Sequence, residues 1–182
     1  MTEPELGDLL ETAWSYLSVG GGKKANARVV VLATVNPSGQ PEARSVVLRA
    51  ATRDQSRIEF HTDLDSQKVS SLSHNPNAQI HLWHPKDNIQ LRLEVAVTLR
   101  RDDYASLQWQ KVPGPSQIAY GKTPPVGARV AGPFEYKNTP SQENFVVVDC
   151  KVSKIDYLSL DGPHFRAVFE ARDGWKGCWI SP

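Results

Sequence analysis

One segment, residues 89–99, constrains the fold of this chain more than any other. Apolar side chains occupy every second position, and polar side chains occupy most positions between them. The apolar set is Ile89, Leu91, Leu93, Val95, Val97 and Leu99, and the polar set includes Gln90, Arg92, Glu94 and Thr98. This alternation is typical of a β-strand with one face in a core and the other in solvent. The chain is therefore predicted to build a sheet around this strand.

Other apolar or β-branched runs, bounded by turn residues, predict further strands. They cover residues 28–35, 44–49, 57–62, 78–83, 144–158, 164–171 and 174–181, and Asn36-Pro37-Ser38-Gly39 predicts a hairpin turn after the first. Helices are predicted over about 4–18, ended by Gly20–Gly22, and over 66–74 and 102–111. The Pro- and Gly-rich residues 113–140 are expected to form a loop, a lid or a dimer arm. Together the segments predict one mainly β domain over residues 1–182, a closed antiparallel barrel with flanking helices.

Composition excludes several classes of protein. A formal net charge of +1, with 40% hydrophobic and 23% charged residues, describes a globular chain without the basic face of a nucleic-acid-binding protein. No apolar run approaches a membrane span, and the acidic N-terminal residues do not resemble a signal peptide. Cys150 and Cys178 lack metal-ligand spacing, so no metal site is predicted. We expect a cytoplasmic protein that binds neither membrane nor nucleic acid.

Residues 44–68 suit an anionic ligand. Arg44 and Arg49 stand at the two ends of a predicted strand, and their spacing of five places them on opposite faces of the sheet. Ser66 is placed to cap the next helix, whose amides and Lys68 would face an anion. Taken singly, each arginine is more typical of a solvated cation at the end of a strand. Ser66 and Lys68 alone are more typical of an ordinary capped helix with an exposed lysine. Considered together, they favour a site for a phosphate ester.

This pattern, continued through Thr62, Asn75-Pro76 and Gln90, resembles the FMN-binding half of the pyridoxamine 5′-phosphate oxidase family. The resemblance implies an antiparallel Greek-key split barrel that binds FMN between the two barrels of a homodimer. It assigns cofactor contacts to Arg44, Ser45, Val46, Val47, Arg49, His61, Thr62, Ser66, Gln67, Lys68, Gln90 and Arg166. Gln67 stands where the family commonly has an arginine, and His61 where it has a tyrosine. A surface glutamine is the alternative interpretation of Gln90.

The substrate half of the resemblance is less complete. By position, Arg49, Ser116 and His164 match substrate contacts. Gly162 and Val112 replace arginines that contact the vitamin phosphate, and Gln108 replaces a tyrosine. These replacements predict a substrate other than pyridoxamine phosphate.

Several functions remain open on the sequence alone. The resemblance implies an FMN-dependent oxidoreductase with an undefined small substrate, and a true pyridoxamine or pyridoxine 5′-phosphate oxidase is the named alternative. A non-enzymatic protein that binds flavin or haem is a second alternative, and an oligomeric barrel without a cofactor is a third. Because the flavin supplies the redox chemistry, no catalytic side chain is assigned.

Overall fold

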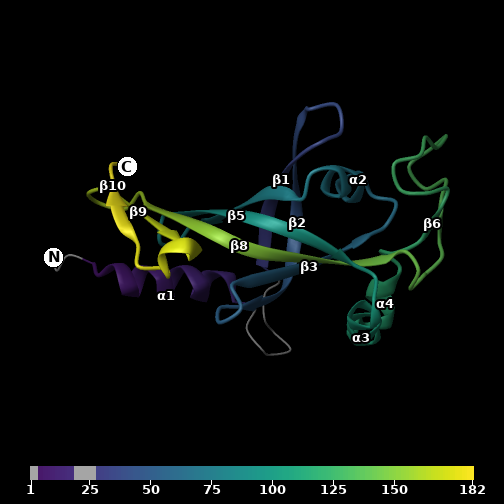
Figure 1. Ribbon diagram of the computed structural model, residues 1–182. Helices are drawn as coiled ribbons and strands as arrows, with labels where there is room; N and C mark the ends of the chain where they lie inside the picture. Colours follow the sequence, from purple (N-terminus) through teal and green to yellow (C-terminus); the bar gives the residue numbers. More distant parts are fainter. Residues whose placement is uncertain (1–3, 19–27) are drawn as a thin grey trace.

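The computed structural model describes residues 4–18 and 28–182 and is mainly β (Figure 1). Its helices are α1 (Leu6–Leu17), α2 (Gln67–His74), α3 (Asp103–Lys111) and α4 (Gly114–Gln117). Its strands are β1 (Arg28–Val35), β2 (Pro41–Thr52), β3 (Arg57–Asp63), β4 (Asn77–His84), β5 (Ile89–Arg100), β6 (Lys122–Thr123), β7 (Lys137–Asn138), β8 (Phe145–Ser159), β9 (Phe165–Glu170) and β10 (Cys178–Ile180). The predicted helix stop at Gly20–Gly22 lies outside the described residues.

Six of the strands close into a barrel. The sheet order is β10-β9-β8-β3-β2-β1-β4-β5, and an additional pairing joins β5 to β8. All pairings within this sheet are antiparallel, and β4 returns beside β1 after the β1-β2-β3 meander, which is a Greek-key connection. The predicted closed antiparallel barrel with flanking helices is therefore confirmed.

The hairpin between β1 and β2 forms where the sequence predicted it. The Asn36 side-chain oxygen accepts hydrogen bonds from the backbone amides of Ser38 (3.0 Å) and Gln40 (2.9 Å), so the turn is held by its own first residue. Gly39 takes a φ of +84°, a conformation that costs glycine little. The turn fixes the β1–β2 register, which pairs Leu32 with Arg44.

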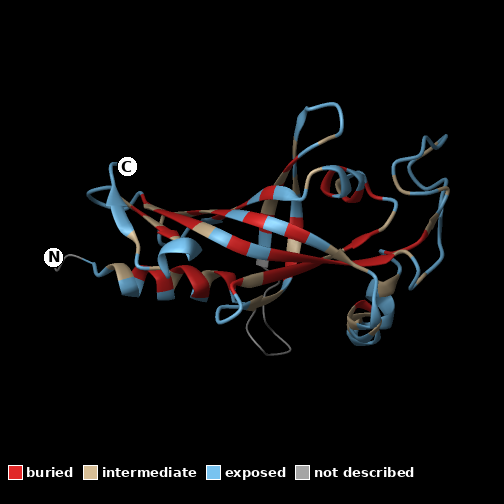
Figure 2. Ribbon diagram, in the orientation of Figure 1, coloured by how far each residue is buried: buried red, intermediate tan, exposed pale blue. Residues whose placement is uncertain are grey.

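Buried and exposed residues alternate along β5 as the sequence predicted. Leu91 and Leu93 are fully buried, whereas Glu94 and Thr98 are exposed, and the stripes of buried and exposed residues are visible on the strands in Figure 2. Helix α1 covers part of the barrel, with Leu17 fully buried in the same core cluster. Most of the stabilisation comes from this apolar burial.

Strand β8 runs along the length of the molecule (Figure 1). It pairs with β3 through Val146 and Thr62, and with β9 through Leu158 and Arg166. Val146 and Leu158 are 12 residues apart on β8, which at the usual rise per residue is about 40 Å. Helices α3 and α4 lie toward one end of the strand, and β9 and β10 lie at the other.

The last predicted strand, 174–181, is shorter than expected. A 3-10 turn at Ala171–Asp173 is followed by positive φ angles at Gly174, Trp175 and Gly177, so extended pairing begins only at Cys178. A Cβ at Gly177 would lie 2.5 Å from the Phe169 ring, so packing also requires glycine there. In the described parts of the chain, no helix is long and apolar enough to span a bilayer.

Candidate functional site

Three of the predicted phosphate ligands come together where β3 ends and α2 begins. The buried Thr62 hydroxyl lies 3.1 Å from the Ser66 hydroxyl and accepts a 3.1 Å hydrogen bond from Nζ of Lys68. Gln67 opens α2 with an exposed side chain. The short β3–α2 turn therefore gathers hydroxyl and ammonium groups within hydrogen-bond distance of one another.

Arg44, on the neighbouring strand β2, brings a second cation to this turn. Burial is the largest cause lowering the pKa of Lys68, and the charge of Arg44 lowers it further, whereas Asp63 acts in the opposite direction. Arg44 is anchored by a 2.6 Å hydrogen bond from Nη1 to Oγ1 of Thr34 on β1. Because the two cations disfavour each other, an anion bound beside both would be stabilised.

One detail of the predicted helix cap is wrong. Ser66 occupies the N-cap position of α2, but its hydroxyl makes no capping bond to the helix. The hydroxyl donates to the backbone oxygen of Asp63 over 2.7 Å instead. The start of α2 therefore has no capping bond from Ser66, which leaves the positive end of the helix dipole available to an anion.

Glu42 belongs to this cluster and was missed by the sequence analysis. Its carboxylate accepts hydrogen bonds from Nη2 of Arg44 (2.7 Å), Oγ of Ser71 (3.0 Å), Nδ2 of Asn36 (3.4 Å) and Nε2 of Gln67. Burial opposes ionisation, but the bonds from Ser71, Arg44 and Asn36 outweigh it, so the pKa of Glu42 is lowered. Its spacing of two from Arg44 on one strand was the available signal, because such residues share a face.

Two other predicted cofactor contacts, Gln90 and Arg166, lie in one cross-strand row. Leu158 on β8 pairs with Gln90 on β5 and with Arg166 on β9. Oε1 of the half-buried Gln90 lies 3.3 Å from Nε2 of His81 on β4. The row thus presents an amide and a guanidinium from two strands that flank β8.

Asp156 fixes Arg166 in this row, and sequence reasoning did not include it. Arg166 donates to both carboxylate oxygens, from Nε over 2.9 Å and from Nη2 over 2.7 Å. Arg92 forms a second ion pair with the same carboxylate, whose side chain is only 8% exposed. Burial raises the pKa of Asp156, but the hydrogen bonds from Arg166 and Arg92 reverse the shift, so the net pKa is lowered.

The predicted cofactor ligands therefore form two separate groups in one chain. Thr62 pairs at the Val146 end of β8, whereas Arg166 pairs at the Leu158 end, about 40 Å away along the strand. Ser116, in α4, and His164, between β8 and β9, are both exposed and also lie toward opposite ends of the molecule (Figure 1). A single chain does not bring these residues to one place.

The predicted contacts along β2 face both sides of the strand. Val46 is buried in the barrel core, Ser45 is exposed, and Val47 is half-buried. Arg49 is exposed at a register shift between β2 and β3, where one extra residue interrupts the ladder. Burial raises the pKa of Tyr120, and the charge and hydrogen bond of Arg49 oppose that shift. Arg49 is therefore placed beside the segment that follows α4.

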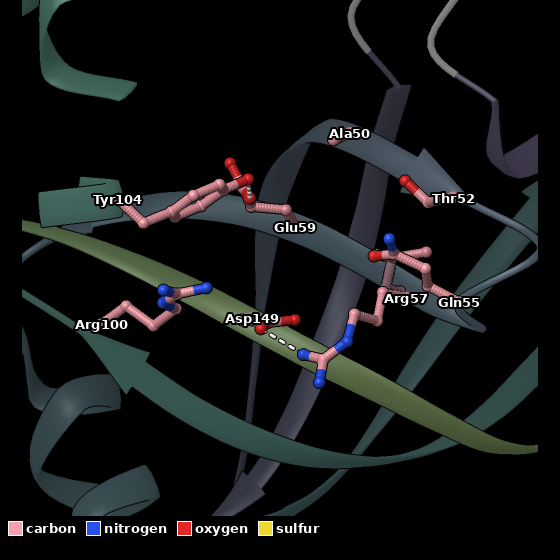
Figure 3. Close-up of a pocket in the computed structure, with 9 residues that line it drawn as sticks. Ala50, Thr52, Gln55, Arg57, Glu59, Arg100, Tyr104 and Asp149 are labelled. Atoms are coloured by element: carbon pink, nitrogen blue, oxygen red, sulfur yellow. Dashed lines mark hydrogen bonds and ion pairs between the residues drawn. The ribbon is translucent and has the colours of Figure 1, made fainter. Parts of the chain in front are cut away.

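His61 joins a polar network on the outer face of β3. Its Nε2 lies 2.8 Å from Oε1 of Glu59, and the Tyr104 hydroxyl donates to Oε2 of Glu59 over 2.6 Å. Figure 3 shows Tyr104 and Glu59 meeting at one side of a pocket of about 280 Å³, which Arg57, Asp149 and Arg100 also line. Burial and the Glu59 hydrogen bond raise the pKa of Tyr104 to about 12. Sequence reasoning missed Glu59 and Tyr104 because they are distant in sequence.

The chain is a split barrel in which hydroxyl and ammonium groups meet where β3 ends and α2 begins. A family model described as pyridoxamine 5′-phosphate oxidase, FMN-binding domain, matches residues 9–100, and the chain belongs to this family. The predicted family and its cofactor, FMN, are confirmed.

Individual relatives agree with the family. A pyridoxine/pyridoxamine 5′-phosphate oxidase of Acinetobacter baumannii is 37% identical over 97 residues, which are 53% of this chain and 44% of that protein. The chain thus matches less than half the length of this relative. A pyridoxamine 5′-phosphate oxidase-related, FMN-binding protein from Nostoc punctiforme superimposes with a TM-score of 0.72 at 24% identity, covering 100% of both chains. PhzG from Burkholderia lata, solved with tetrahydrophenazine-1-carboxylic acid, gives 0.72 at 17% identity over 99% of this chain and 94% of its own. The two structures support the fold.

We expect Tyr104→Phe to lower the free energy of unfolding at pH 7 by about 1.5–3 kcal/mol, because the buried Glu59 carboxylate loses a charge-assisted hydrogen bond. Burial raises the pKa of Glu59, but the bonds from His61 and Tyr104 outweigh it and the net pKa is lowered. The stabilisation is therefore present above the ordinary pKa of about 4.3 and is lost as the pH falls. Urea unfolding at pH 7 and at pH 3 measures both effects. The exposed Tyr136→Phe is the control, and equal stability of the two variants at pH 7 would contradict the network.

Proposed function

We propose that the protein is an FMN-dependent oxidoreductase that acts on a small substrate other than pyridoxamine phosphate. The observation that carries this proposal is that two cations, Arg44 and Lys68, lie close enough to repel each other beside the start of α2, where Ser66 makes no side-chain capping bond. These groups are donors suited to a phosphate monoester. Bound FMN supplies hydride transfer, so the chain needs only to hold the cofactor and admit a substrate.

The residues present fit the cofactor in two parts. Arg44, Lys68 and Thr62 would hold the phosphate, since they supply two cations and a hydroxyl around one turn. Gln90 and Arg166 would contact the ring, because an amide can both donate to and accept from the edge of a heterocycle. Asp156 holds the Arg166 guanidinium in place through two hydrogen bonds.

FMN affinity should depend on the two cations of the turn. Arg44→Ala and Lys68→Ala should each weaken FMN binding by about 1.5–3 kcal/mol, the usual contribution of a charge-assisted hydrogen bond. Riboflavin, which lacks the phosphate, should lose most of this dependence. Fluorescence titration of the flavin-free chain measures both ligands, and the exposed Lys176→Ala is the control. If both variants hold FMN as tightly as the parent chain, the phosphate site is wrong.

We also propose a homodimer, because a second copy can join the two groups of ligands that one chain places at opposite ends of β8, about 40 Å apart along the strand. Exposed apolar side chains at Leu107, Ile118, Phe134 and Trp83 are consistent with a buried interface. Light scattering at micromolar concentration should give twice the mass of the 20.2 kDa chain. A monomer that retains bound FMN would contradict this assembly.

The substrate proposal rests on charge. Pyridoxamine phosphate is a dianion, yet Val112, Gly162 and Gln108 contribute no charge at the aligned positions. Losing two cationic contacts costs roughly 3 kcal/mol or more, about a hundredfold in affinity. The natural substrate is therefore smaller or less anionic than the vitamin phosphate.

Steady-state oxygen uptake with pyridoxamine phosphate tests this proposal. We expect at most feeble turnover by the FMN-loaded protein, with a control reaction that omits the substrate. A micromolar Michaelis constant would restore the vitamin oxidase. Absorption bands of oxidised flavin without NAD(P)H or substrate turnover would instead favour a flavin-binding protein that is not an enzyme.

A further inference from the structure

The carboxylate of Glu42 already occupies donors that a phosphate would use. Arg44, Ser71, Asn36 and Gln67 all donate to it, and these donors come from β2, α2 and the β1–β2 turn. Within the described residues, no other carboxylate makes a hydrogen bond to Arg44. The donors proposed to bind the phosphate therefore already contact a carboxylate of the chain itself.

We propose that Glu42 competes with the phosphate of FMN for Arg44 and the first turn of α2, and that it thereby sets how strongly the protein prefers FMN to riboflavin. This inference rests on the proposed phosphate site. Glu42 makes the protein a weaker binder of FMN, with a smaller preference for FMN over riboflavin, than Arg44 and Lys68 alone would make it. Removal of its negative charge should strengthen FMN binding.

The geometry supports competition in two respects. First, a guanidinium that donates Nη2 to Glu42 and Nη1 to Thr34 has fewer donors left for a phosphate. Second, a dianion bound beside Arg44 and Lys68 would lie close to the Glu42 carboxylate, and like charges at short range destabilise each other. The Glu42 side chain is 16% exposed and stands near the start of β2, so rotation toward solvent can release its donors.

A positioning role makes the opposite prediction. If Glu42 served only to orient Arg44 toward the cofactor, its removal would free the guanidinium to move and would weaken FMN binding. The sign of the change in affinity therefore separates the two roles. Glu42→Gln removes the charge and keeps the size of the side chain, whereas Glu42→Ala also removes the acceptor that would orient Arg44.

The experiment titrates the flavin-free chain with FMN and with riboflavin at fixed ionic strength, following the quenching of flavin fluorescence. Glu42→Gln should tighten FMN binding on the order of tenfold and leave riboflavin binding unchanged. Glu94→Gln removes a charge from an exposed side chain on β5 and is the matched control. Circular dichroism verifies that each variant is folded.

A double variant connects the effect to the proposed contact. In an Arg44→Ala background, Glu42→Gln should give a smaller gain, because the competed donor is gone and only the repulsion between Glu42 and the phosphate is relieved. Equal or weaker FMN binding by Glu42→Gln would overturn the competition, even when Arg44→Ala still weakens FMN. If Arg44→Ala has no effect and the parent chain binds FMN and riboflavin equally, the proposed phosphate site fails as well. The two failures are therefore distinguishable.

Discussion

The pairing of β8 with two partners at once is the constraint on which the rest of the structure depends. Residues Phe145–Lys151 pair with β3, and residues Val147–Ser159 pair with β5. This double pairing satisfies the backbone groups of what would otherwise be two sheet edges, and it encloses the apolar faces of β3 and β5. The same strand holds the two groups of polar residues apart: Thr62, beside the α2 turn, pairs with Val146, whereas Gln90 and Arg166 pair with Leu158.

The chemistry of the two groups differs in how the charges are balanced. At the α2 turn, Arg44 forms an ion pair with Glu42, and Asp63 is the carboxylate that acts on Lys68. The repulsion between the two cations favours an incoming anion. At the β9 row, the single carboxylate of Asp156 forms ion pairs with both Arg166 and Arg92. The first group therefore places two cations where they would favour a charged ester, whereas the second holds the Arg166 guanidinium in a fixed orientation that would suit a polar ring.

Much of the fold followed from local patterns, because strand alternation and turn chemistry act over a few residues. The β5 alternation and the Asn36–Gly39 turn are of this kind. The length of β10 did not follow, since positive φ angles at Trp175 and Gly177 and the contact with Phe169 arise from packing. In the candidate site, Arg44 and Lys68 could be named because they match the pattern of a known family. The hydrogen bond between Tyr104 and Glu59 could not be predicted, because the two residues are 45 positions apart and no local sequence pattern connects them.

The position of β8 in the sequence has a consequence for biosynthesis. The barrel strands β1 to β5 are all complete by residue 100, but the strand that closes them begins at Phe145. A ribosome must therefore add 44 further residues, from 101 to 144, before β3 and β5 can meet their common partner. During that interval both edges are open to pairing with other chains. Closure late in synthesis depends on contacts distant in sequence, and topologies of this kind fold slowly.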